Sequence, residues 1–96
     1  QQISFNLYQS GKSIEEIAKE RDFVYSTIKK HLTYYIELGK LDIADFLSEE
    51  KIKTIKAALV ETETNSLKEI KEDLADDYTY GDIRMVIALL KSKENN

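Results

Sequence analysis

The sequence predicts an all-α protein of about six helices, and three observations lead to this fold class. Proline is absent and glycine occurs only at positions 11, 39 and 81, so few residues interrupt a helix. Apolar residues recur at spacings of three and four along most of the 96-residue chain, as they do on one face of a helix. Capping-box patterns, which open helices, occur at Ser13, Ser66 and Thr79.

The first two helices are short. Ile3 and Leu7 predict a helix that ends at Ser10-Gly11, where glycine suits the position after a helix end. The capping box of Ser13 and Glu16 then opens a helix that we expect to run to Glu20.

A tight break at residues 21–24 separates this helix from the next one. The third helix is predicted from Tyr25 to Leu38, and Gly39 ends it. Two helices joined by a short turn indicate a helix-turn-helix, here a winged-helix-like unit. Residues 40–43, where a wing strand would begin, are too few to pair, so we expect no wing and one turn at residues 43–47 that packs back on the core. The buried stripe of the third helix is expected to be Ile28, Leu32, Tyr35 and Ile36.

Three more helices are predicted in the second half, at residues 48–61, 66–74 and from 79 to about 91, with a loop at 63–65 and a frayed tail at 92–96. Ser13 aligns with Ser66 at an offset of 53 residues, and Ile28-Lys29 aligns with Ile83-Arg84 at an offset of 55. This echo indicates a second, degenerate helix-turn-helix, although any two capped helix pairs look alike. The turn of this second half is acidic, and its last helix begins with Tyr-Gly-Asp. We therefore expect this half to support the helix-turn-helix unit or to make other interactions, and not to contact phosphate.

We interpret residues 1–96 as one helical domain, with a helix-turn-helix unit at 1–42 and a supporting helical half at 48–92. The chain starts with Gln1, which suggests a piece of a longer protein. Cysteine is absent and His31 is the only histidine, so a disulfide framework and a thiol metal site are excluded and a reducing compartment is compatible. No apolar run in the sequence is long enough to predict a membrane-spanning helix.

The residues that we expect to contact DNA lie on the polar face at the start of the third helix, which in this motif enters the major groove. Lysines would neutralise phosphates, and hydroxyl groups would donate hydrogen bonds to phosphates or base edges. Both lysines are expected to point outward. The alternative is an ordinary solvated helix face. The candidate DNA-binding residues are Tyr25, Ser26, Thr27, Lys29, Lys30 and Thr33.

Other residues have simpler interpretations. Tyr25 and Tyr34 could stack on unpaired bases, whereas Tyr35 is expected in the core. His31 is expected to pack, with a ring nitrogen bonded to a nearby partner. The carboxylates are scattered over helix surfaces and no glycine-rich loop is present, so we expect no catalytic, cofactor-binding or metal-binding residue in this chain.

Three stretches resemble a known family. Residues 7–18 (LYQSGKSIEEIA), 26–32 (STIKKHL) and 37–43 (ELGKLDI) are similar to the helicase helix-turn-helix domain at the C-terminus of bacterial RecQ-type ATP-dependent DNA helicases. The similarity continues into residues 67–70 (LKEI) and 80–84 (YGDIR). One departure is Val24, where relatives commonly have a serine or threonine cap, so this helix end is looser or Asp22 supplies the cap.

The resemblance implies an accessory, non-enzymatic domain of a helicase that acts in DNA repair and recombination in the bacterial cytoplasm at the nucleoid. ATP, Mg and Zn would then belong only to other domains of that parent. The expected partner is DNA, bound weakly and in a salt-dependent way. Other domains of the parent helicase are a further possible partner, and no membrane contact is expected. The net charge of −4 opposes phosphate binding and favours the alternative, a protein-protein interaction module without DNA contact. A sequence-specific transcription regulator is less favoured, because no dimerisation helix stands out.

Overall fold

The computed structural model describes residues 1–62 and 66–94, and these residues form six α-helices, one short 3-10 helix and no strand. The predicted all-α class, with six helices and no wing, is confirmed. The elements are α1 (Gln2–Gln9), α2 (Ile14–Arg21), α3 (Tyr25–Glu37), η1 (Ile43–Asp45), α4 (Glu49–Glu61), α5 (Leu67–Glu72) and α6 (Tyr80–Glu94).

Most helix starts have the side-chain caps that the sequence predicts. Ser13 and Glu16 form a complete capping box at α2, and Ser48 caps α4 by accepting from the Lys51 backbone N–H. At α6, the Asp82 N–H donates to Thr79 Oγ1 and the Thr79 N–H donates to Asp82 Oδ2, at 3.1 and 3.2 Å. These bonds satisfy backbone donors that the first turn of a helix leaves free.

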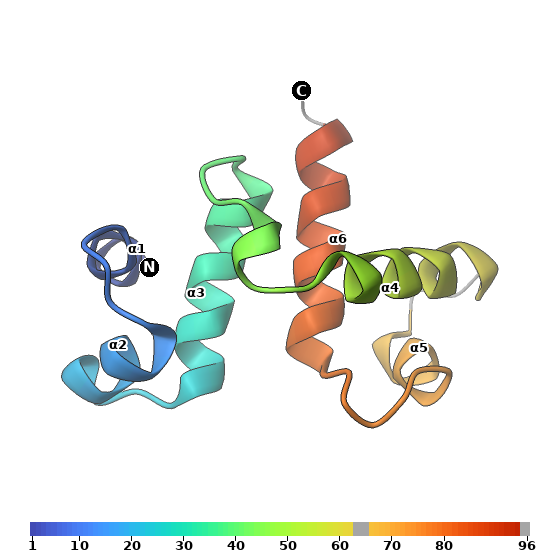
Figure 1. The fold of residues 1–96 in the computed structure, drawn as a ribbon, viewed down its shortest axis with the longest axis horizontal. Helices are drawn as coiled ribbons and strands as arrows, with labels where there is room; N and C mark the ends of the chain where they lie inside the picture. Colours follow the sequence, from blue (N-terminus) through green and yellow to red (C-terminus); the bar gives the residue numbers. More distant parts are fainter. Residues whose placement is uncertain (63–65, 95–96) are drawn as a thin grey trace.

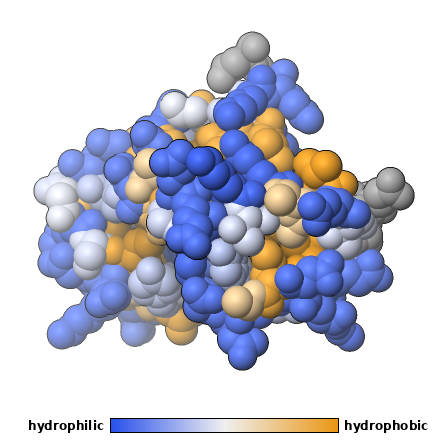
Figure 2. All heavy atoms as spheres, turned by 45° about the vertical axis from the view of Figure 1, so that its right-hand side comes forward, coloured by the Kyte–Doolittle hydropathy of each residue, from blue (hydrophilic) through white to orange (hydrophobic). Residues whose placement is uncertain are grey.

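Helix α3 lies at the centre of the molecule beside α6, and the two run in the same direction (Figure 1). Helices α1 and α2 pack on the side of α3 away from α6, while α4 and α5 pack against α6. Hydrophilic side chains cover most of the face in Figure 2, and hydrophobic atoms show in patches between them. The helix-turn-helix of α2 and α3 is therefore built against a second helical half.

The core consists of two apolar clusters that α3 joins. Ile28 and Leu32 belong to one cluster with residues of α2, whereas Ile36, one turn further along, belongs to the other cluster, which contains residues of the second half such as Ile70. Leu41 and Phe46 are partly buried against both clusters. The predicted buried stripe of α3 is confirmed, including Tyr35, whose ring stacks on Phe5 at a centroid distance of 4.1 Å.

The turn after α3 agrees with the prediction, and the end of the chain differs from it. The turn at residues 43–47 forms as η1, and Ile43 and Leu47 are buried in the core as predicted. The frayed tail is wrong for residues 92–94, because α6 continues to Glu94 and Ser92 is buried. The predicted loop at 63–65 and the last residues of the tail, 95–96, lie outside the described residues.

Candidate nucleic-acid interface

The turn between α2 and α3 is compact. Asp22 ends α2 in the left-handed region, with φ of 57°, and Val24 stands directly before α3. No side chain caps the start of α3, so Asp22 does not replace the missing serine or threonine. The first backbone N–H groups of α3 therefore lack the side-chain acceptor that α2, α4 and α6 have.

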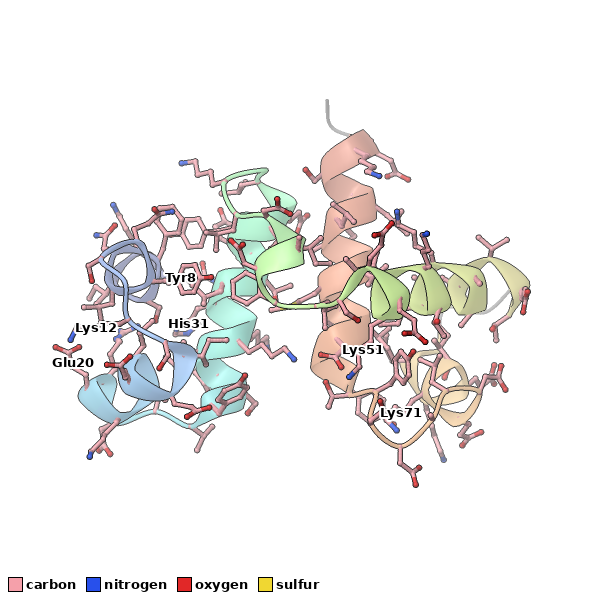
Figure 3. The ribbon with its side chains drawn as sticks, in the orientation of Figure 1. Tyr8, Lys12, Glu20, His31, Lys51 and Lys71 are labelled. Atoms are coloured by element: carbon pink, nitrogen blue, oxygen red, sulfur yellow. The ribbon has the colours of Figure 1, made fainter. Side chains whose placement is uncertain are left out.

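A hydrogen-bonded cluster fixes this turn against α1. Arg21 Nη1 donates to Ser4 Oγ at 2.7 Å, and Ser4 Oγ lies 2.9 Å from His31 Nδ1. The Phe23 ring meets the His31 ring edge to face, with the Arg21 guanidinium 4.7 Å from the Phe23 centroid. Figure 3 shows His31 on the part of α3 that faces α1 and α2. The predicted packing role of His31, with a bonded ring nitrogen, is confirmed.

The surroundings of His31 also affect its charge. Ser4 Oγ accepts from Arg21 and shares a hydrogen bond with His31 Nδ1, in which the donor is set by the tautomer of the ring. Burial, and then the positive charges of the amino terminus, Arg21 and Lys30, lower the pKa of His31 below its usual value. The ring is thus a neutral packing group at pH 7.

The start of α3 faces the start of α6 across a cleft of about 560 Å³. The residues from α3 that line it are the six predicted to bind DNA: Tyr25, Ser26, Thr27, Lys29, Lys30 and Thr33. The opposite wall consists of Thr79, Tyr80, Gly81 and Arg84. Sequence-based reasoning missed this second wall, although the alignment of Ile28-Lys29 with Ile83-Arg84 already paired the two helix starts.

Lys29 does not point outward as expected. Its ammonium donates to Asp82 Oδ1 at 2.6 Å, and the side chains of Lys29 and Asp82 are only 16% and 5% exposed. The aliphatic stem lies against Gly81, where the Cβ atom of any larger residue would come within 3.2 Å of Lys29 Cδ. The outward orientation predicted for Lys29 is therefore wrong, because a buried carboxylate on α6 holds this lysine across the helix interface.

Asp82 is held by cations from two helices. Lys51 Nζ on α4 lies 3.7 Å from Asp82 Oδ2 and donates to the Asp77 carbonyl at 2.8 Å (Figure 3). Burial alone would raise the pKa of Asp82, but the hydrogen bond from Lys29, the Thr79 N–H and the charges of Lys29 and Lys51 outweigh it and lower the pKa. The carboxylate is thus ionised, buried and paired.

Lys30, which follows Lys29 in the sequence, is exposed and forms no ion pair with a described residue. Ser26 is also exposed, while the Thr33 hydroxyl is half-buried and donates to the Lys29 carbonyl at 2.8 Å. Tyr25 is 48% exposed. Tyr34 is exposed too, but it is not among the described residues that line the cleft, and its ring meets Tyr35 edge to face.

The comparison with protein families agrees with this architecture. The model of a family described as a helix-turn-helix domain matches residues 1–87, so the chain belongs to that family. The helix-turn-helix is a motif that binds DNA through its second helix, which is α3 here. Searches of curated proteins and of solved structures found no match. Among the described helices, none has the length and apolar character needed to cross a membrane.

Proposed function

We propose that this domain binds nucleic acid through the first half of α3. The observation that carries the proposal is that all six residues predicted to bind DNA on α3 line one cleft. Membership of a helix-turn-helix family supports it, because this motif presents the start of its second helix to DNA.

The residues have separate roles in this proposal. Lys30, exposed and without a described ion-pair partner, neutralises a phosphate, and Ser26 and Thr27 donate hydrogen bonds to phosphate oxygens or base edges. Tyr25 offers a ring for contact with a base. Lys29 orders the cleft wall through Asp82, since its charge is already paired.

We further propose that the domain is an accessory module of a RecQ-like ATP-dependent DNA helicase. The support is the sequence similarity in residues 7–18, 26–32 and 37–43, together with residues 80–84. In such a parent, other domains would supply the motor with ATP and Mg and the zinc-binding module, and this domain would help to hold the DNA.

The first test is the affinity for a labelled forked DNA, measured by fluorescence anisotropy at about 20 mM salt, where screening is weak. We expect weak binding, because few cations are free, and a loss of affinity in Lys30→Gln. The salt dependence of that variant should become shallower by about one unit in slope, as expected for the loss of one phosphate contact.

Lys68→Gln is the matched control, because Lys68 is an exposed lysine on α5, outside the set of residues that line the cleft. It removes the same charge and should bind like the unchanged protein. Equal losses in the two variants, or no binding of the unchanged protein, would contradict the proposed function.

The second candidate function is a protein-protein interaction module. It is favoured by the net charge of −4 and by the exposed apolar turn of Phe23, Val24 and Tyr25, which are 42%, 65% and 48% exposed. Exposed apolar side chains in a row are typical of a docking surface for another protein. Absence of any DNA binding in the test above would favour this candidate.

A further inference from the structure

The cleft has two walls from two helix starts, and the second wall belongs to the half of the chain that the sequence assigned to support. Thr79, Tyr80, Gly81 and Arg84 of this half face the predicted DNA-binding residues of α3. Whatever occupies the cleft therefore contacts both halves of the molecule.

The charge of the cleft differs from that of the whole chain. None of the described residues that line it is acidic, whereas the chain as a whole carries 18 acidic and 14 basic residues. Asp82, which made phosphate contact at α6 look unfavourable, is buried and paired with Lys29 and Lys51. This leaves the charges of Lys30 and Arg84 without an ion-pair partner among the described residues.

Each wall also carries an exposed aromatic ring. Tyr25 on α3 and Tyr80 on α6 are 48% and 41% exposed. The Arg84 guanidinium lies 6.0 Å from the Tyr80 ring centroid. Cations beside exposed aromatic rings are the combination that proteins use to bind single strands, with phosphates on the cations and bases stacked on the rings.

The arrangement of the helices disfavours a duplex in this cleft. The major groove, about 12 Å wide, admits one helix of about 10–12 Å diameter, but α6 packs alongside α3. The cleft volume of about 560 Å³ falls in the range of pockets for small ligands. A cleft of this size suits part of a single strand and not a double helix.

We propose that the cleft between α3 and α6 binds a single strand of nucleic acid, with Lys30 and Arg84 on its phosphates and with bases stacked on Tyr25 and Tyr80. This inference rests on the proposed function and extends it, because it names the form of the nucleic acid and assigns Tyr80 and Arg84 as binding residues. Gly81 keeps the second wall close to Lys29, since a side chain there would press on the lysine stem.

The test compares a labelled mixed-sequence single-stranded DNA of about 12 nucleotides, a length typical of single-strand sites, with the duplex of the same sequence. Anisotropy titrations of the full chain should show tighter binding of the single strand. Tyr80→Leu should weaken that binding at least about fivefold, as expected for the loss of one stacked base. Arg84→Gln should weaken it and make the salt slope shallower by about 0.7.

The chain offers matched controls for both variants. Tyr34→Leu removes an exposed tyrosine of α3, and Lys91→Gln removes an exposed charge of α6; neither residue is among the described residues that line the cleft. Both controls should bind like the unchanged protein, and circular dichroism melting verifies that each variant is folded.

The outcomes separate the two proposals. If Lys30→Gln weakens binding but Tyr80→Leu and Arg84→Gln match their controls, or if the duplex binds as tightly as the single strand, the inference is overturned and the proposed function stands. If the unchanged protein binds neither DNA, both proposals fail.

Discussion

At the scale of residues, the adjacent lysines Lys29 and Lys30 have different surroundings. Lys29 forms a buried ion pair with Asp82 that joins α3 to α6, whereas Lys30 is exposed at the cleft. The sequence could not separate them, because both lie near the polar face of α3 and the buried carboxylate comes from a residue 53 positions away. Only the packing of α6 against α3 decides which lysine is paired.

Replacement of each lysine by methionine tests this difference. Lys29→Met leaves the buried Asp82 carboxylate without its closest cation, so the free energy of unfolding should fall by about 3 kcal/mol, near the lower end for a broken buried pair because Lys51 and Thr79 remain. Lys30→Met, the matched control at an exposed position, should stay within about 0.5 kcal/mol. Urea denaturation at pH 7 measures both, and equal stabilities would contradict the assigned ion pair.

At the scale of elements, α3 begins without a side-chain cap, whereas α2, α4, α5 and α6 each begin with one. Val24 has the extended conformation of a capping residue, with φ of −82° and ψ of 158°, but its side chain has no acceptor. The sequence indicated either this weakness or a cap from Asp22, because an N-cap is a local feature of a few residues, and the structure shows no side-chain cap. The sequence also predicted most helix bounds to within a few residues, for the same local reason.

Val24→Ser should therefore stabilise the protein, by about 1 kcal/mol, since a serine oxygen at this position can accept from an N–H of the first turn of α3. Little apolar contact is lost, because Val24 is 65% exposed. Val60→Ser, the same change at a 78% exposed position inside α4, is the control and should change stability little, because valine and serine have similar helix propensities. A thermal melt in which both variants shift equally would show that capping is not the cause.

At the scale of the whole molecule, α3 makes contacts that join the two halves. Ile36 is 2% exposed because it packs with residues of the second half, and the Lys29–Asp82 pair crosses the same interface. The sequence predicted the helices and one wall of the site, but not the second wall. The sequence held two hints of the second wall, an acidic residue in the first turn of α6 and a weak internal repeat. Neither hint indicates that Asp82 is buried or that Arg84 faces α3.

A chain truncated after Asp42 should lose cooperative thermal unfolding. The truncation removes α4, α5 and α6, so it uncovers Ile36 and leaves Lys29 without Asp82. Circular dichroism followed over temperature should show a broad, low-temperature change in place of one sharp transition. A fragment that melts as sharply as the whole chain would mean that residues 1–42 fold independently.

A titration followed by backbone amide chemical shifts tests whether the cleft between α3 and α6 binds nucleic acid. Forked DNA added at about 20 mM salt should move the amide signals of residues 25–33 and 79–84, which form the two walls. The signals of α4 and α5 should stay in place. Shifts confined to α4 and α5, or no shift anywhere, would contradict the account.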